Sequence, residues 1–251
     1  MHLHRRYKVQ QASESLMVGC LLSASGGLQD AYTYNIRDEV FANAQTGNIV
    51  LLGENLALGN WDIALRYLLP LIAFAAGIYL TEAIHAMFPN HGSHTLHWRH
   101  GVLLLEILVL LAVGWMPQKW NLPANMLVSF VCAMQVEAFR TVEGNSYATT
   151  MCIGNLRSGM ENLYYWHKNH DLSRRHKAGL YFMVIVFFLI GAAVGGVFSP
   201  MWEEATIWLC CPLLLLAFVL MLRIHSRRLQ FLEWIAGVEE ENEPDGHTGN
   251  I

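Results

Sequence analysis

The sequence predicts an all-α integral membrane protein, a polytopic transmembrane helical bundle of about eight hydrophobic segments built as two related halves. Three observations lead there. Only 14% of the 251 residues are charged while 54% are hydrophobic, whereas a soluble domain carries about 25% charged residues. Several stretches approach the roughly 20 apolar residues that cross a bilayer as a helix. A Gly-Asn motif also occurs twice, in similar surroundings.

Six of the segments are clearly apolar. The span 13–34 contains Asp30 near its end, and 101–116 is interrupted only by Glu106. The span 178–202 contains no Asp, Glu, Lys or Arg. The other three clear segments are 64–87, 122–136 and 205–222. Each is compatible in length and composition with a membrane helix.

Two weaker segments, 41–59 and 147–165, resemble each other. Thr46-Gly47-Asn48-Ile49 recurs 107 residues later as Ile153-Gly154-Asn155-Leu156, and Glu54-Asn55-Leu56 recurs at the same offset as Glu161-Asn162-Leu163. Each weak segment follows a span that ends in a similar phrase and precedes a span with a Phe-x-x-Gly motif, Phe74–Gly77 or Phe188–Gly191. Three matches in the same order indicate a duplication.

The duplication divides the chain into a first membrane repeat, 13–116, and a second, 122–224. The flanking parts are a cytoplasmic N-terminus, 1–12, and a cytoplasmic, partly disordered tail, 225–251. If the two weak segments cross the membrane, there are eight spans and the halves run parallel. If they are broken or re-entrant, there are six spans and the halves are inverted. About 18 residues in each weak segment slightly favour eight.

Basic residues predict the orientation, because they gather on the cytoplasmic side of a membrane. They occur before the first span, in the loop that carries Arg174, Arg175 and Lys177, and after the last span at Arg223. Both topologies place all three clusters on one side. The N- and C-termini are therefore expected in the cytoplasm of a multi-pass protein. The two topologies differ in the side on which the loop 88–100 lies.

The motifs resemble those of a known family. Gly27-Leu28-Gln29-Asp30-Ala31-Tyr32, followed by the run from Val40 to Asn48, is similar to the YoaK-type family of bacterial inner-membrane proteins, whose function is not known. The run Tyr147–Met151 and the motif Gly154–Ser158 resemble the second half of that family. One departure is Ile153, where the family usually has Thr. The resemblance implies a bacterial cytoplasmic (inner) membrane and a small-molecule transporter.

The duplicated motif supplies the candidate site. Glycine permits a helix to bend, Asn and Thr satisfy backbone groups at a break, and transporters place their sites at interrupted helices in matching positions of two repeats. Buried carboxylates near such a break indicate a cation or proton pathway. Tight packing and interfacial placement are the competing explanations. The candidate substrate-binding residues are Asp30, Thr46, Gly47, Asn48, Glu54, Glu106, Glu137, Gly154, Asn155, Arg157 and Glu161. Arg157 lies four residues before Glu161, a spacing that allows an ion pair.

The sequence thus predicts a small-solute transporter or channel with a site between the repeats and with protonation of one buried carboxylate as the driving step. The alternative is a membrane-embedded enzyme acting on a lipid or a small apolar substrate. No catalytic constellation or cofactor motif is present in the sequence, so we expect no cofactor and no resident metal. The expected partners are membrane lipids and an unidentified small molecule or ion. A net charge of −4 argues against nucleic acid, and homo-oligomerisation stays open.

Overall fold

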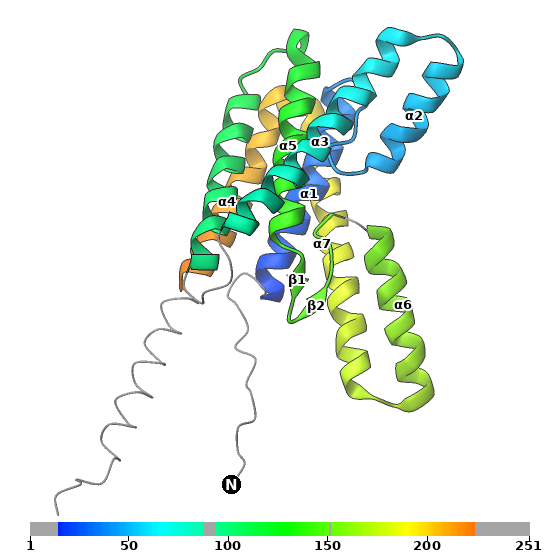
Figure 1. The fold of residues 1–251 in the computed structure, drawn as a ribbon, viewed down its shortest axis with the longest axis vertical. Coiled ribbons are helices and arrows are strands. Elements are labelled where there is room, and N and C mark those ends of the chain that lie inside the picture. Colours follow the sequence, from blue (N-terminus) through cyan, green and yellow to red (C-terminus); the bar gives the residue numbers. More distant parts are fainter. Residues whose placement is uncertain (1–14, 88–93, 151, 224–251) are drawn as a thin grey trace, which may run out of the picture.

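The computed structural model is an all-α bundle with one short β-hairpin, and it describes residues 15–87, 94–150 and 152–223 (Figure 1). The predicted termini, 1–12 and 225–251, lie outside the described residues, as does the first part, 88–93, of the loop 88–100. The helices are α1 (Leu16–Ile36), α2 (Gln45–Ala57), α3 (Trp61–Met87), α4 (His94–Val113), α5 (Asn121–Ala138), α6 (Cys152–Asn169) and α7 (Leu172–Trp202). The short elements are η2 (Gln118–Trp120), β1 (Thr141–Val142), β2 (Asn145–Ser146) and η3 (Glu203–Leu209), and residues 210–223 are again helical.

Every hydrophobic segment expected from the sequence contains a helix, and the all-α prediction is confirmed. The main difference is in length. Helix α2 has 13 residues, which at 1.5 Å per residue is about 20 Å, less than the roughly 30 Å of a bilayer core. Residues 37–44 are not helical, because Asn48 holds them as a loop. Gly59, at φ 76°, adopts a conformation that a side chain would strain and begins the turn into α3.

The centre of the bundle is formed by two interlocked helix pairs, in which α1 packs along α7 and α5 packs along α3. The contacts are close because glycines lie in them. A methyl group on Gly191 of α7 would overlap the carbonyl oxygen of Ala24 in α1, and one on Gly77 of α3 would overlap that of Phe130 in α5. Each half of the chain therefore packs its third helix against the first helix of the other half.

The helices α1 and α5 run in opposite directions (Figure 1). At one end of the bundle, the fully buried Arg37 closes α1 and donates to Tyr32 Oη at 2.8 Å and to Asn121 Oδ1, at the start of α5, at 2.9 Å. The same guanidinium donates to the carbonyl oxygens of Val113 and Met116, where α4 ends, at 3.0 and 2.7 Å. Arg37 thus fixes the C-terminus of α1 beside the start of α5.

The side chains are distributed differently from those of a typical soluble protein, because a mainly apolar core also contains many polar groups and the outer faces carry large apolar side chains. Polar side chains such as Ser23, Gln29, Glu106 and Ser129 are completely buried. Large apolar side chains are exposed on the outer faces, among them Ile72 and Leu80 of α3, Leu104 and Leu108 of α4, and Leu189 and Val197 of α7. Two helical stretches, Trp61–Met87 and Leu172–Arg223, are long and apolar enough to cross a membrane.

The helix crossings give a first prediction. Gly191→Ala places a methyl group against the backbone of α1 and should lower the unfolding free energy by about 1–3 kcal/mol, because backbone atoms yield less than side chains do. Thermal unfolding of the purified protein in detergent measures the change. Gly179→Ala on the same helix is the matched control, since a methyl group there meets nothing within 4 Å. Equal melting temperatures for the two variants would contradict the close crossing.

Candidate functional site

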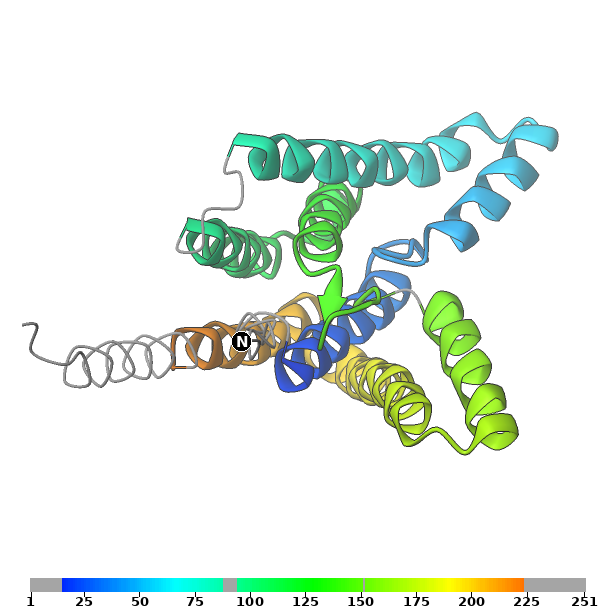
Figure 2. The ribbon, with the colours of Figure 1, turned by 60° about the horizontal axis from the view of Figure 1, so that its bottom comes forward.

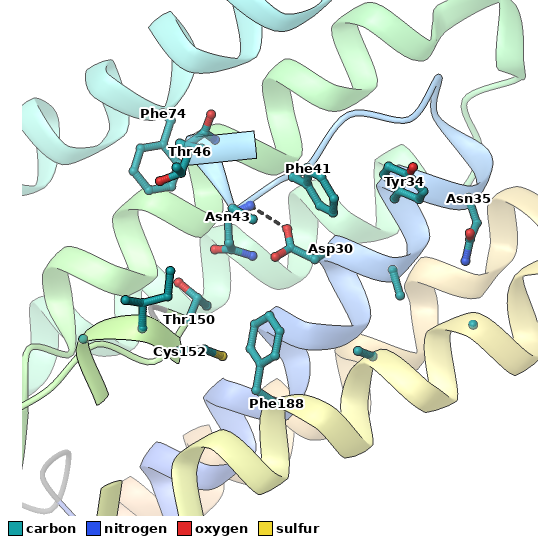
Figure 3. Close-up of a pocket in the computed structure, with 17 residues that line it drawn as sticks. Asp30, Tyr34, Asn35, Phe41, Asn43, Thr46, Phe74, Thr150, Cys152 and Phe188 are labelled. Atoms are coloured by element: carbon teal, nitrogen blue, oxygen red, sulfur yellow. Dashed lines mark hydrogen bonds between the residues drawn. The ribbon is translucent and has the colours of Figure 1, made fainter. Parts of the chain in front are cut away.

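A cavity of about 770 Å³ lies between α1, the first turns of α2 and α6, and the helices α3 and α7. Asp30 and Tyr34 come from α1, and Phe41 and Asn43 from the loop that follows it. The polar and aromatic lining residues are shown in Figure 3. This volume is typical of small-molecule sites, which are mostly apolar with a few polar groups.

The lining draws on corresponding positions of the two halves. Asn43, Gln45 and Thr46 line the cavity at the start of α2. The residues 107 positions later, Thr150, Cys152 and Ile153, line it at the start of α6. The phenylalanines of the two Phe-x-x-Gly motifs, Phe74 and Phe188, also line it. The cavity therefore lies where the two weak segments converge (Figure 3).

The two Gly-Asn motifs form the same hydrogen bonds. Asn48 Nδ2 donates to Phe41 O at 2.7 Å, and Phe41 N donates to Asn48 Oδ1 at 3.0 Å. In the second half, Asn155 Nδ2 donates to Ala148 O at 2.7 Å, and Ala148 N donates to Asn155 Oδ1 at 3.4 Å. Each amide thus satisfies a non-helical backbone seven residues earlier, which a buried loop requires.

The asparagines of the Glu-Asn-Leu phrases are also equivalent. Asn55 Nδ2 donates to Leu51 O and Asn162 Nδ2 to Ser158 O, both at 2.8 Å and both one turn back along the helix. Each amide oxygen also accepts from the beginning of the next helix, since Asn60 Nδ2 donates to Asn55 Oδ1 at 3.3 Å and Arg174 Nη1 donates to Asn162 Oδ1 at 3.0 Å. These side chains stabilise α2 and α6 rather than face the cavity.

Asp30 is 6% exposed and lies on the cavity wall contributed by α1. Asn43 N donates to Asp30 Oδ1 at 2.7 Å, so the carboxylate also fixes the loop that leads into α2. Asn43 Nδ2 donates to Gly26 O at 3.3 Å, while its Oδ1 is buried with no hydrogen-bond partner in the structure. The carboxylate of Asp30 thus accepts a hydrogen bond from the loop and is also part of the cavity wall.

Glu106 is completely buried, but it does not line the cavity. Gln29 Nε2 donates to Glu106 Oε1 at 2.9 Å. With its amide nitrogen turned toward the carboxyl group, Gln135 donates to Oε1 and Oε2 at 2.9 and 3.0 Å. Gln29 and Gln135 occupy matching places near the ends of α1 and α5, so the two halves hold this carboxyl group between them.

The structure separates the residues predicted for the site. Asp30, Thr46 and Gly154 line the cavity, whereas Gly47 packs beside Phe41, and Asn48 and Asn155 lie buried behind the lining. The remaining four lie elsewhere. Glu137 accepts from Arg140 Nη1 at 2.8 Å, and Glu54, Arg157 and Glu161 are exposed. The allowed Arg157–Glu161 ion pair is not among the ion pairs of the described residues.

The sequence did not single out the aromatic part of the lining. Tyr34 and Phe41 stack with ring centroids 4.8 Å apart beside the cavity, and both precede the Gly-Asn motif. The repeated Phe-x-x-Gly motif was a usable signal, because Phe74 and Phe188 both line the cavity. It was interpreted only as a mark of duplication, since spacing alone does not tell which side of a helix faces a cavity.

A family model described as "Protein of unknown function (DUF1275)" matches residues 18–220. The chain belongs to this family. The match covers both Gly-Asn segments and all of the described cavity lining of this DUF1275 protein, and it agrees with the YoaK-type resemblance of the motifs. No curated protein and no solved structure matches the chain.

The hydrogen bonds of the motif give a second prediction. Asn48→Ala leaves the partly buried backbone groups of Phe41 without their side-chain partner and should lower the unfolding free energy by about 1–3 kcal/mol. Hydrogen exchange of the amides in 37–47 should accelerate, whereas exchange in α5 should not. The control is Asn60→Ala, which removes only an exposed contact to Asn55. Unchanged exchange in Asn48→Ala would contradict the anchoring role.

Proposed function

We propose that this DUF1275 protein is an integral membrane transporter or channel for a small solute, with the cavity as its binding site. The observation that carries the proposal is the lining by corresponding positions of both halves, at the N-terminal ends of α2 and α6. Secondary transporters bind their substrates at interrupted helices in the interface between structural repeats. The site is asymmetric, because Asp30 has no carboxylate counterpart among the described lining residues of the second half.

Membrane insertion is supported by the large apolar side chains on the outer faces of the helices and by the polar groups buried among them. The exposed outer faces of α3, α4 and α7 are rich in Leu, Ile and Val, while Gln29, Glu106 and Gln135 are buried among the helices. Large exposed apolar surfaces are costly in water and favourable in lipid. Intramembrane carboxylates are costly in lipid and therefore face the interior of a bundle. The family resemblance points to the bacterial cytoplasmic membrane.

We infer that the two halves are inverted repeats with six crossings. Supporting this, α1 and α5 run in opposite directions, and the pairs α1–α7 and α3–α5 cross at corresponding glycines (Figure 1). Helix α2 is too short to cross. Helix α6, although longer at 18 residues, carries Arg157, Glu161 and Lys168. Figure 2 shows α2 and α6 on the same side of the bundle, each joined to the following helix as a hairpin.

Charge sets the orientation. The end of the bundle formed by the β-hairpin and the α6–α7 turn carries Arg140, Lys168, Arg174, Arg175 and Lys177. The opposite end carries fewer exposed basic residues, Arg66 and Lys119, together with acidic residues in the α1–α2 loop, at the start of α3 and in η3: Asp38, Glu39, Asp62, Glu203 and Glu204. The positive-inside rule assigns the basic end to the cytoplasm, together with both chain termini.

A membrane enzyme fits the cavity less well. Acid–base chemistry on a lipid needs at least two convergent groups. Of the described residues that line the cavity, Asp30 is the single carboxylate, and no histidine is among them. Among the residues that the structure describes, no three His, Cys, Asp or Glu side chains are grouped to hold a metal ion.

Glu106 is the carboxyl group that we assign to coupling. Gln29, one of its two partners, precedes Asp30 on the cavity wall, and the amide of Gln135 lies 3.4 Å from Thr149 Oγ1, next to the lining residue Thr150. The other titratable groups near Glu106 are the thiols of Cys132, Cys210 and Cys211. Gain or loss of a proton at Glu106 changes its hydrogen bonds to both halves, and hence their relative arrangement.

The proposal predicts two-sided access to the cavity. Cys152 lines the cavity and is half-buried, so a membrane-impermeant thiol reagent should modify it in both right-side-out and inside-out vesicles. Mass spectrometry identifies the modified cysteine, and Cys152→Ser gives the background from the other half-buried thiol, Cys211. Modification from one side only, under all conditions, would point to a fixed pocket and reject transport.

If proton exchange at Glu106 drives the conformational change, the accessibility of Cys152 from the two sides of the membrane should depend on pH. In the wild-type protein, the ratio of Cys152 modification from the two sides should change with pH, because Glu106 exchanges a proton. Glu106→Gln keeps the shape and a hydrogen-bonding side chain but cannot ionise, so its ratio should be constant with pH. Glu82→Gln, at an exposed site in α3, is the control. A persisting pH response in Glu106→Gln would remove Glu106 from the mechanism.

A further inference from the structure

The cavity has one net charge in its wall. Of the 17 described residues that line it, Asp30 alone is charged, and no Arg, Lys or His is among them. In the low dielectric of such a site an unpaired carboxylate favours a cationic partner and disfavours an anion. The exposed Arg157, at the far side of the first turn of α6, does not line the cavity.

The N-terminal end of α2 already has a negative group beside it. Free N–H groups at a helix N-terminus attract anions. Here the backbone N–H of Asn43, just before α2, donates to Asp30, and Gly47 N in the first turn donates to Ala44 O. The Asp30 carboxylate thus occupies the place beside α2 where a bound anion would lie.

Aromatic rings form much of the remaining wall. Phe41, Phe74 and Phe188 line the cavity together with Tyr34, which stacks on Phe41. In Figure 3 the carboxyl group of Asp30 is turned toward the space between Phe41, Asn43 and Phe188. The faces of aromatic rings attract cations and also bury apolar surface.

A bare metal ion fits poorly, because hard cations need about six oxygen ligands. The lining offers mainly carbon atoms around one carboxylate. An ammonium group, which carries several N–H donors on one centre, matches one carboxylate backed by aromatic rings.

We propose that the cavity binds a compact, mainly apolar molecule that carries one protonated amine, with the ammonium group at Asp30 and the apolar body among Phe41, Phe74 and Phe188. This substrate class rests on the proposed function, because it names what the transport site accepts. Specificity for charge comes from Asp30, and specificity for size comes from the rings.

The test compares three probes that share one body: 2-phenylethylamine, phenylacetate and 2-phenylethanol. Their affinities for the purified full-length protein in detergent are measured by isothermal titration calorimetry. The amine should bind about tenfold or more tightly than the alcohol, and phenylacetate should bind most weakly. Equal affinities for the amine and phenylacetate, or no binding of the amine to folded protein, would overturn the proposal.

Two variants test whether the negative charge of Asp30 is responsible for selective binding of the amine. Asp30→Asn keeps an acceptor for the N–H of Asn43, so the loop stays anchored, but it should weaken amine binding about tenfold and leave the alcohol unaffected. Thr46→Lys places a positive charge on the part of the lining formed by the first turn of α2, and it should weaken binding of the amine in the same way. Glu161→Gln removes an equal charge outside the cavity and should change nothing. Amine affinity that survives in folded Asp30→Asn and Thr46→Lys refutes the role of Asp30.

The outcome is separable from that of the transport proposal. Amine-selective binding that depends on Asp30, combined with one-sided access to Cys152, would leave the ligand class standing and reject transport. Two-sided access to Cys152 without amine selectivity would leave transport standing and reject this ligand class.

Discussion

The crossing of α1 with α7 and of α3 with α5 is the constraint on which the rest of the structure depends. Gly191 and Gly77 bring backbones into direct contact, and in lipid such contact supplies the packing that the hydrophobic effect cannot. Each crossing joins the first helix of one half to the third helix of the other. The halves cannot separate without breaking both crossings. The cavity between them lies beside the non-helical residues that precede α2 and α6.

In the membrane that we propose, those breaks would leave backbone groups without partners, and each unsatisfied group is costly there. The asparagine of each Gly-Asn motif solves this by pairing with a backbone N–H and C=O seven residues earlier. The motif is therefore the device that permits a loop within the bundle. The cavity lies beside this loop. Asp30 contributes a carboxyl group to its wall, and Phe74 and Phe188 contribute aromatic rings.

The helical segments could be predicted because they follow from local composition, and the repeated phrases pointed to Asn48 and Asn155, which form the same hydrogen bonds. The length of α2 could not be predicted, since the apolar run 41–59 contains no signal that its first residues are held as a loop by Asn48. The sequence also could not predict which side chains point into the cavity. Glu54 and Glu161 share a repeat position yet are exposed, whereas Phe74 and Phe188 line the cavity because of how α3 and α7 rotate against their partners. Arg37 showed no pattern in the sequence, because its partners Asn121 and Val113 are more than 70 residues away.

The inverted, six-crossing arrangement is the central claim, and the side of the membrane on which two turns lie tests it most directly. Single cysteines are placed at the exposed positions Asn60 and Gln118, with Cys152 and Cys211 replaced by serine. A membrane-impermeant thiol reagent is then applied to intact cells. The account predicts that both cysteines react without lysis, whereas one at Asn169 reacts only after lysis. Protection of both Asn60 and Gln118 positions in intact cells would contradict it, because eight parallel crossings place them in the cytoplasm.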